Sequence, residues 1–136
     1  MSENYFFKDK EKKFLQPELF GKKAEEIARC FIGEGRNGVT SSQLRRFFHQ
    51  IKSMERKALN QDAPWEMIEP ELLMIKAKVK YAVAKQDKFN KPYYQRMESF
   101  ICDHIDRVRC KEDFFAFSKM FEAVIGYFYG YGGKDA

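Results

Sequence analysis

Three glycines near residue 35 have the spacing of a phosphate-binding loop. Gly33, Gly35 and Gly38 match the pattern G-x-G-x-x-G, and Glu55 follows at nearly the distance of the carboxylate that binds a ribose in dinucleotide-binding proteins. Such a loop requires a strand before the glycines, because the pyrophosphate lies where the strand turns into a helix. Residues 22–30 have the composition of a helix instead. We therefore expect a loop between two helices and no nucleotide cofactor.

Cysteine, histidine and aspartate residues cluster between positions 102 and 110, and these side chains are potential metal ligands. Cys102 and His104 are two residues apart, with Asp103, Asp106 and Cys110 nearby. On a helix, positions two apart point about 200° away from each other, so they cannot share an ion. A zinc site needs four ligands in converging directions. The sequence predicts no metal site, with core or half-exposed cysteines and a surface histidine.

No arrangement of residues predicts catalysis. His49 and His104 are the only histidines, and His49 lies beside Phe48 on the second expected helix, away from its apolar face. The acidic residues of the fourth expected helix and the turn after it scatter as on a solvated surface: Glu98, Asp103, Asp106, Glu112 and Asp113. No ordering of serine or cysteine with histidine is distinctive. We expect no catalytic residue, and the chain is not predicted to be an enzyme.

Basic residues are concentrated in two segments, which could bind an anionic partner. Residues 45–57 contain five cations against Glu55, and residues 76–91 contain six lysines against Asp87. A row of cations on a helix can follow the phosphates of a nucleic acid. A solvated face and an acidic protein partner remain alternatives. The candidate RNA-binding residues are Arg45, Arg46, Lys52, Arg56, Lys76, Lys78, Lys80 and Lys85.

The elements that must position these residues are predicted to be helices. Apolar residues recur at helical spacing, and no segment alternates with the period of a strand. The expected helices are residues 17–31, 40–60, a third from Pro64 or Pro70 to the break at 89–92, 93–109 and 113–129. We expect an all-α, single-domain bundle of about five helices. Residues 1–16 form a flexible arm, 17–133 the helical domain and 134–136 a tail. The arm's aromatic residues could dock on the body or on a partner.

The second helix has the clearest start signal. Thr40 and Gln43 form a capping box, in which each side chain bonds the other's free backbone N–H. An apolar stripe follows at helical spacing, comprising Leu44, Phe47, Phe48, Ile51 and Met54. The stripe places Arg45, Lys52 and Arg56 along one flank.

Aromatic residues make up 16% of the chain, with 14 Phe and 7 Tyr. Phe114, Phe117, Phe121 and Phe128 occupy one side of the last helix and are predicted core. Other rings and one methionine lie on its remaining faces, and a helix in so small a bundle does not bury every side. We expect part of this surface to be a subunit interface, with Phe115, Tyr127 and Tyr129 as its residues; Met120 and Tyr131 lie on the same faces.

Composition excludes several classes of protein. A net charge of +5 with 33% charged residues and 44% hydrophobic residues is typical of a globular domain. No stretch reaches the length of a membrane span, and no signal segment is present at the start. Three cysteines without paired spacing favour reduced thiols and the cytoplasm. We expect no membrane partner.

Three stretches together resemble a known family. Residues 40–52 (TSSQLRRFFHQIK), 78–85 (KVKYAVAK) and 114–128 (FFAFSKMFEAVIGYF) are similar in order and spacing to the small subunit of type III-A CRISPR effector complexes, the Csm complex. The resemblance covers roughly residues 25–133. Residues 1–15 and the glycine loop lie outside the matching stretches.

This resemblance implies a noncatalytic α-helical protein of antiviral defence. Several copies would stack into an inner filament that lines the channel for guide and target RNA, beside the other subunits of the complex. The family contacts the RNA backbone without reading sequence. The resemblance carries this role to Arg45, Arg46 and Lys52, and to Lys78, Lys80 and Lys85, whereas Arg56 and Lys76 rest on charge alone.

Two other functions remain as alternatives. One is a small helical DNA-binding regulator with the second helix as its reader, although no short helix-turn-helix pair precedes that helix. The other is a metal-dependent ribonuclease, which needs carboxylates or histidines on the basic face. Only His49, Glu55 and Asp87 are available there.

Overall fold

The structure is a computed structural model that describes residues 4–35 and 37–133. Its described residues form five α-helices, one short 3₁₀ helix and two isolated β-bridges, with no strand. The prediction of an all-α bundle is confirmed. The tail expected at 134–136 lies outside the described residues. The elements are η1 (Pro17–Phe20), α1 (Lys22–Cys30), α2 (Ser41–Asn60), α3 (Trp65–Ala84), α4 (Lys91–Ile105) and α5 (Lys111–Gly130).

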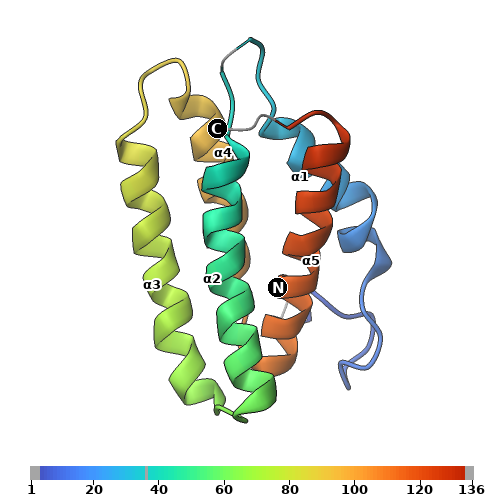
Figure 1. Cartoon of the computed structure of the whole chain (residues 1–136). Helices are drawn as coiled ribbons and strands as arrows, with labels where there is room; N and C mark the ends of the chain where they lie inside the picture. The colour runs from blue at the N-terminus through green and yellow to red at the C-terminus, as the bar shows by residue number, and fades with distance from the viewer. Residues whose placement is uncertain (1–3, 36, 134–136) are drawn as a thin grey trace.

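The long helices run up and down along one common direction (Figure 1). α2 and α3 lie side by side and antiparallel, α4 lies behind them, and α1 lies on the outer side of α5. α3 packs mainly against α4, whereas α5 packs against both α1 and α2. The beginnings of α2 and α4 and the ends of α3 and α5 therefore meet at one end of the bundle. No helix of the described chain is long and apolar enough to cross a membrane.

Only half of the predicted capping box forms at the start of α2. The Thr40 hydroxyl accepts a hydrogen bond from the Gln43 N–H at 3.3 Å, as expected. The backbone N–H of Thr40 donates instead to the hydroxyl of Tyr94 at 3.2 Å, and the Gln43 side chain accepts from Arg46. The reciprocal bond is replaced because Tyr94, buried on α4, brings an acceptor to the same donor.

The structure shows which of the two prolines, Pro64 or Pro70, precedes the start of α3. The helix begins at Trp65 with Pro64 as its N-cap, and Pro70 lies inside it. Pro70 falls within the first two turns, where the missing N–H affects a single bond near the helix end. Apolar residues at helical spacing form the buried face of this helix, which comprises Leu72, Ile75, Val79, Ala82 and Val83.

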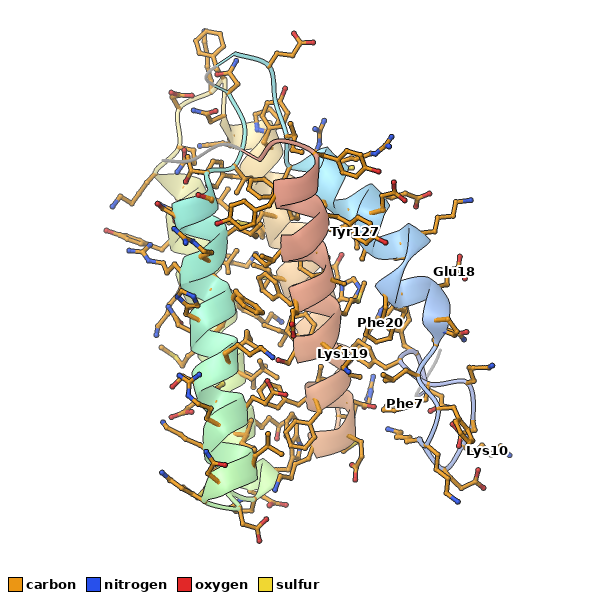
Figure 2. All side chains as sticks on the ribbon, turned by 45° about the vertical axis from the view of Figure 1, so that its right-hand side comes forward. Phe7, Lys10, Glu18, Phe20, Lys119 and Tyr127 are labelled. Atoms are coloured by element: carbon orange, nitrogen blue, oxygen red, sulfur yellow. The ribbon has the colours of Figure 1, made fainter. Side chains whose placement is uncertain are left out.

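α5 is the central helix of the core. Phe114, Phe117, Phe121 and Phe128 are fully buried, which confirms the predicted stripe. Met120, expected on an outer face, is fully buried as well. That expectation was wrong because η1 and α1 pack along a second side of α5. Figure 2 shows Phe20, together with Phe7 from the preceding loop, between this N-terminal segment and α5.

Residues 4–16 form a loop that folds back on the bundle. Phe7 and Leu15 make an isolated antiparallel bridge, and the Gln16 N–H donates to the Phe6 carbonyl at 2.9 Å. Phe6 is fully buried. The sequence left open whether the aromatic residues of the arm dock on the body or on a partner. The Phe6 ring packs into the body of the same chain.

His104 is buried, contrary to its predicted place on the surface. Its Nδ1 lies 2.8 Å from the carbonyl oxygen of Phe100, and its Nε2 lies 3.0 Å from the Tyr5 hydroxyl. The Arg107 guanidinium covers the Tyr5 ring at 3.9 Å from its centroid. Burial lowers the pKa of His104 to about 4, an effect that the Phe100 carbonyl opposes only in part.

Asp113 is a second residue placed wrongly on the surface. Its carboxylate is buried and accepts from Lys12 Nζ at 2.9 Å and from the backbone N–H of Arg109 at 3.0 Å. Both His104 and Asp113 are covered by the N-terminal loop, through Tyr5 and Lys12. The sequence left open whether this segment docks on the body or on a partner, so it did not predict that these two side chains are buried. This loop therefore carries the polar partners of two buried side chains.

The buried histidine predicts acid sensitivity of the fold. Because the folded pKa is about 4 and the unfolded pKa about 6.5, the contribution of His104 is complete above pH 6.5 and is lost as the pH falls toward 4. The loss amounts to at most about 3 kcal/mol. Urea unfolding between pH 4 and 8 measures it. His104→Gln should flatten this part of the pH profile.

The matched control is His49→Gln, which changes the exposed histidine of α2. It should keep the wild-type pH profile of the unfolding free energy. A parallel loss of stability in the wild type and in His104→Gln between pH 6.5 and 4 contradicts the assignment to His104.

Candidate nucleic-acid interface

The candidate residues of α2 lie on two different flanks of the helix. Lys52 reaches Glu122 of α5, and Arg45 and Arg56 share its side of α2 by helical spacing. Arg46 and Gln50 lie on the other flank, where they face α3. Arg45 and Arg46, although consecutive in the sequence, therefore lie on different flanks of the helix.

Lys52 is engaged by carboxylates of its own chain. Its Nζ lies 2.9 Å from Glu55 and 3.3 Å from Glu122, and Glu55 also accepts from the Ser118 hydroxyl at 2.8 Å. Burial alone would lower the pKa of Lys52, but the hydrogen bonds and charges of these two glutamates outweigh it and raise the pKa. The ammonium is held between α2 and α5 as part of the helix packing.

Two lysines of α3 are also paired within the chain. Lys76 pairs with Asp106 just after α4, and Lys80 pairs with Glu98 of α4. The hydrogen bond that Lys80 donates to Glu98 is the main cause of the raised pKa of Lys80. Positions 76 and 80 are one turn apart, so both face α4 rather than α2. Their charge is therefore compensated by carboxylates of the same chain.

Lys78 and Lys85 lie on the opposite flank of α3, seven residues apart and toward α2. Between them in the helical register is Tyr81, and the Lys85 ammonium lies 5.0 Å from the centroid of its ring. Here α2 and α3 leave a hollow of about 390 Å³. We call this hollow the α2–α3 groove; it is lined by Arg46, Phe47, Gln50, Ala77, Lys78 and Tyr81.

The groove continues along the two helices toward the α2–α3 turn. A second hollow shares Gln50 and Lys78 with it and extends to Met74. An ion pair between Lys57 and Glu71, at 3.3 Å, joins the two helices at that end. The cations of the groove are therefore concentrated near the start of α2 and the end of α3.

The eight candidate residues fall into two groups. Among the residues that the structure describes, Lys52, Lys76 and Lys80 are paired with carboxylates, whereas Arg45, Arg46, Arg56, Lys78 and Lys85 form no ion pair. Of the second group, Arg46 and Lys78 line one groove with Lys85 adjacent. Arg45 and Arg56 lie on the other flank of α2.

Sequence reasoning missed Tyr81 as a member of this surface. The ring is 67% exposed, the most exposed tyrosine among the described residues. Its spacing from Lys78 and Lys85, three and four residues, places it on their face of a helix. This helical spacing was the signal in the sequence that could have identified Tyr81. Counting the lysines of residues 76–91 as one group did not take the spacing into account.

The candidate interface residues of α5 differ in exposure. Phe115 is half-buried against Phe114, with ring centroids 5.9 Å apart, and Tyr127 is half-buried and stacked on Tyr131. Tyr129 is 41% exposed. Tyr131 is tied down by Arg29 and Glu25 of α1. Tyr129 is therefore the ring of the candidate set that is most available to a partner.

The glycine loop and the cysteine cluster do not form the sites that their spacing imitates. A helix precedes the glycines, as predicted, and Gly38 has a φ of +120° in a turn bridged to Ile32. A Cβ at Gly38 would lie 2.6 Å from the Gly33 nitrogen, so this close approach needs glycine. In the described part of the chain, no group of His, Cys, Asp or Glu residues could hold a metal ion.

These features define a small helical bundle with a cationic groove between two antiparallel helices. The family model described as Csm2 Type III-A matches residues 15–134. The chain therefore belongs to the Csm2 family and is a small subunit of the type III-A CRISPR complex, as its sequence resemblance predicted. A search of curated proteins gave no match.

The distinction between paired and unpaired lysines predicts different effects on stability. Lys52→Met leaves Glu55, whose side chain is 19% exposed, without its cation, and should lower the unfolding free energy by about 1–2 kcal/mol. Lys78→Met, which removes an exposed cation with a 3.5 Å contact to Gln50, should change it by less than about 0.5 kcal/mol. Urea denaturation measures both variants. Equal losses contradict the distinction.

Proposed function

We propose that this chain is a noncatalytic RNA-binding subunit of the type III-A ribonucleoprotein. Several copies line the channel for guide and target RNA and contact the RNA backbone without sequence specificity, in cytoplasmic antiviral defence. The observation that carries the proposal is the α2–α3 groove, in which Arg46 and Lys78 face each other with no carboxylate partner.

The chemistry of the groove suits phosphate contacts. Arg46 and Lys78 have long flexible side chains that bind phosphate oxygens of any sequence. In RNA-guided complexes, base pairing between guide and target reads the sequence, and the protein recognises charge and shape. A groove with two opposed cations is sufficient for that task. Lys85, at its edge, adds a third.

The groove also supports a noncatalytic role. A metal-dependent ribonuclease needs converging carboxylates near the bound phosphate. The carboxylate that lines the neighbouring hollow is Glu71, and it is paired with Lys57. Family membership and this lining together favour the ribonucleoprotein subunit over the ribonuclease and over the DNA-binding regulator.

The distribution of charge along the bundle supports stacking of copies. Arg45, Arg46, Lys85, Lys88 and Lys91 belong to the end where α2 and α4 begin. Asp62, Glu66, Glu69, Asp106 and Glu112 belong to the opposite end, where α3 and α5 begin. Cations outnumber carboxylates at the first end, whereas the second end mixes its carboxylates with cations such as Lys57 and Lys111. Head-to-tail contacts between copies would place the cationic end against these carboxylates.

Aromatic residues at the end of α5 are proposed contacts with a neighbouring copy or another subunit. Tyr129 is the most exposed of the three candidates. Tyr127, two positions earlier, points away from it, and Phe115 lies near the start of α5; both are half-buried. Exposed aromatic rings supply much of the energy of protein contacts. The proposed partners are therefore guide and target RNA, further copies of this chain and other subunits of the complex.

RNA binding is predicted to depend on the unpaired cations. Arg46→Ala with Lys78→Ala should weaken binding of the full chain to unrelated RNA sequences by similar factors. Two lost phosphate contacts should flatten the salt dependence by about 1.4 to 1.8 units. Fluorescence anisotropy at several salt concentrations measures both effects.

The matched control is Lys76→Ala with Lys80→Ala, which removes the same net charge from lysines paired with α4. This variant should keep the wild-type salt dependence. An equal loss of affinity in the two double variants means that binding follows net charge and not the groove.

Assembly is predicted to depend on Tyr129. Tyr129→Ala should leave the melting temperature unchanged, because the ring is 41% exposed, but reduce the amount of subunit that copurifies with the ribonucleoprotein. The control is Phe14→Ala, an exposed ring on the N-terminal loop. A fall in melting temperature assigns Tyr129 to the core, and normal incorporation places the contact elsewhere.

A further inference from the structure

Tyr81 is an aromatic ring that the folding of the chain does not use. It is 67% exposed on α3, although seven phenylalanine rings of the described residues are fully buried. The Lys85 ammonium lies 5.0 Å from its centroid, and Lys78 and Arg46 line the same groove. A ring flanked by three unpaired cations has the composition of a nucleotide-binding surface, in which cations hold phosphates and an aromatic face holds a base.

The space beside the ring fits this use. Ala77 is one turn before Tyr81 on the same helix and lines the groove with it. Its methyl group leaves the hollow of about 390 Å³ open, which is within the range of sites that hold small organic ligands. Gln50 lies across the groove with an amide that offers both a donor and an acceptor to a base edge.

We propose that the α2–α3 groove takes one unpaired nucleotide of RNA, with its base stacked on Tyr81 and its flanking phosphates on Arg46 and Lys78. This inference rests on the proposed function, because it specifies how the same groove holds RNA. It adds a requirement that backbone contacts alone do not impose, namely that one base is neither paired nor stacked on the adjacent bases of the RNA.

Charge and ring chemistry select this occupant over an acidic peptide. The cations alone would suit either partner, but a stacking ring adds binding energy only for a flat aromatic group such as a base. Stacking does not distinguish among bases, since each has an aromatic face. The inference is thus consistent with binding that ignores sequence.

The consequence is a preference for unpaired RNA over a continuous duplex. A base inside a duplex is already stacked and paired, and extracting it costs a few kcal/mol. Single-stranded RNA presents its bases without this cost. The groove would therefore bind a single strand, or a nucleotide displaced from a heteroduplex, more tightly than an uninterrupted duplex.

The test uses the full chain and a single-stranded RNA that carries one 2-aminopurine, whose fluorescence falls when the base stacks. Tyr81→Phe keeps the ring and should keep both the affinity and the fluorescence quenching. Tyr81→Leu removes the ring and should lower the affinity by about five- to a hundredfold and abolish the quenching. Neither variant should change the salt dependence, because no cation is removed.

A second variant leaves the ring and the cations in place. Ala77→Leu fills the space beside Tyr81 on an exposed helical face, so the fold should be kept while stacking is blocked. It should reproduce the loss of affinity and of quenching seen with Tyr81→Leu. Circular dichroism confirms that both variants remain helical.

The outcomes separate the two levels of the proposal. If Tyr81→Leu and Ala77→Leu bind and quench like the wild type while Arg46→Ala with Lys78→Ala binds weakly, stacking is overturned and backbone binding stands. If the wild type binds an uninterrupted duplex as tightly as the single strand, the preference for unpaired RNA is overturned. If the wild type binds no RNA, the proposed function fails with it. In assembled complexes, labels in the guide and in the target distinguish which strand supplies the base.

Discussion

Burial of the phenylalanines of α5 is the constraint on which the rest of the structure depends. Phe114, Phe117, Phe121 and Phe128 are fully buried, and Met120 is buried on a further side of the same helix. One helix buried on so many sides needs neighbours around it, and α1, η1 and α2 supply them. α2 is thereby committed to α5, while α3 packs mainly on α4. The seam between α2 and α3 is less filled, and the groove lies there.

The same packing sorts the lysines and arginines by their neighbours. Cations on the flanks that face α5 and α4 meet carboxylates of those helices, as Lys52 does on α5 and Lys80 on α4. Cations at the α2–α3 seam, Arg46 and Lys78, have amide groups of Gln43 and Gln50 as their contacts. Neutral partners leave the full charge available. The groove is thus basic because of which helices flank it, more than because of how many lysines the segment contains.

The fold could be predicted from the sequence, because apolar periodicity is a local signal. The stripe of α2 agrees with the structure, and α3 begins next to Pro64, one of the two prolines between which the sequence did not decide. His104 was misplaced although it continues the buried spacing of Met97, Ile101 and Val108, so its position carried information that its polar character obscured.

The site was less predictable for a different reason. Whether Lys76 or Lys78 is paired depends on which helix lies beside each flank of α3, and the order of residues does not give that. Lys76 and Lys78 belong to the same basic segment of the sequence. In the structure, however, Lys76 pairs with Asp106 and Lys78 lines the groove. The half-formed capping box at Thr40 has the same origin, since its second partner, Tyr94, comes from a distant helix. Pairing across helices requires the tertiary arrangement.

The small number of unpaired cations in the groove has a consequence for the proposed assembly. Arg46, Lys78 and Lys85 can neutralise only a few phosphates, and each such contact contributes modestly at physiological salt. A single copy would therefore bind RNA weakly. In the proposed row of copies, these grooves would recur at a fixed spacing, so that each further contact with one RNA strand would be intramolecular. Affinity would then come from repetition, and the proposed interface at α5 would control RNA binding without touching RNA.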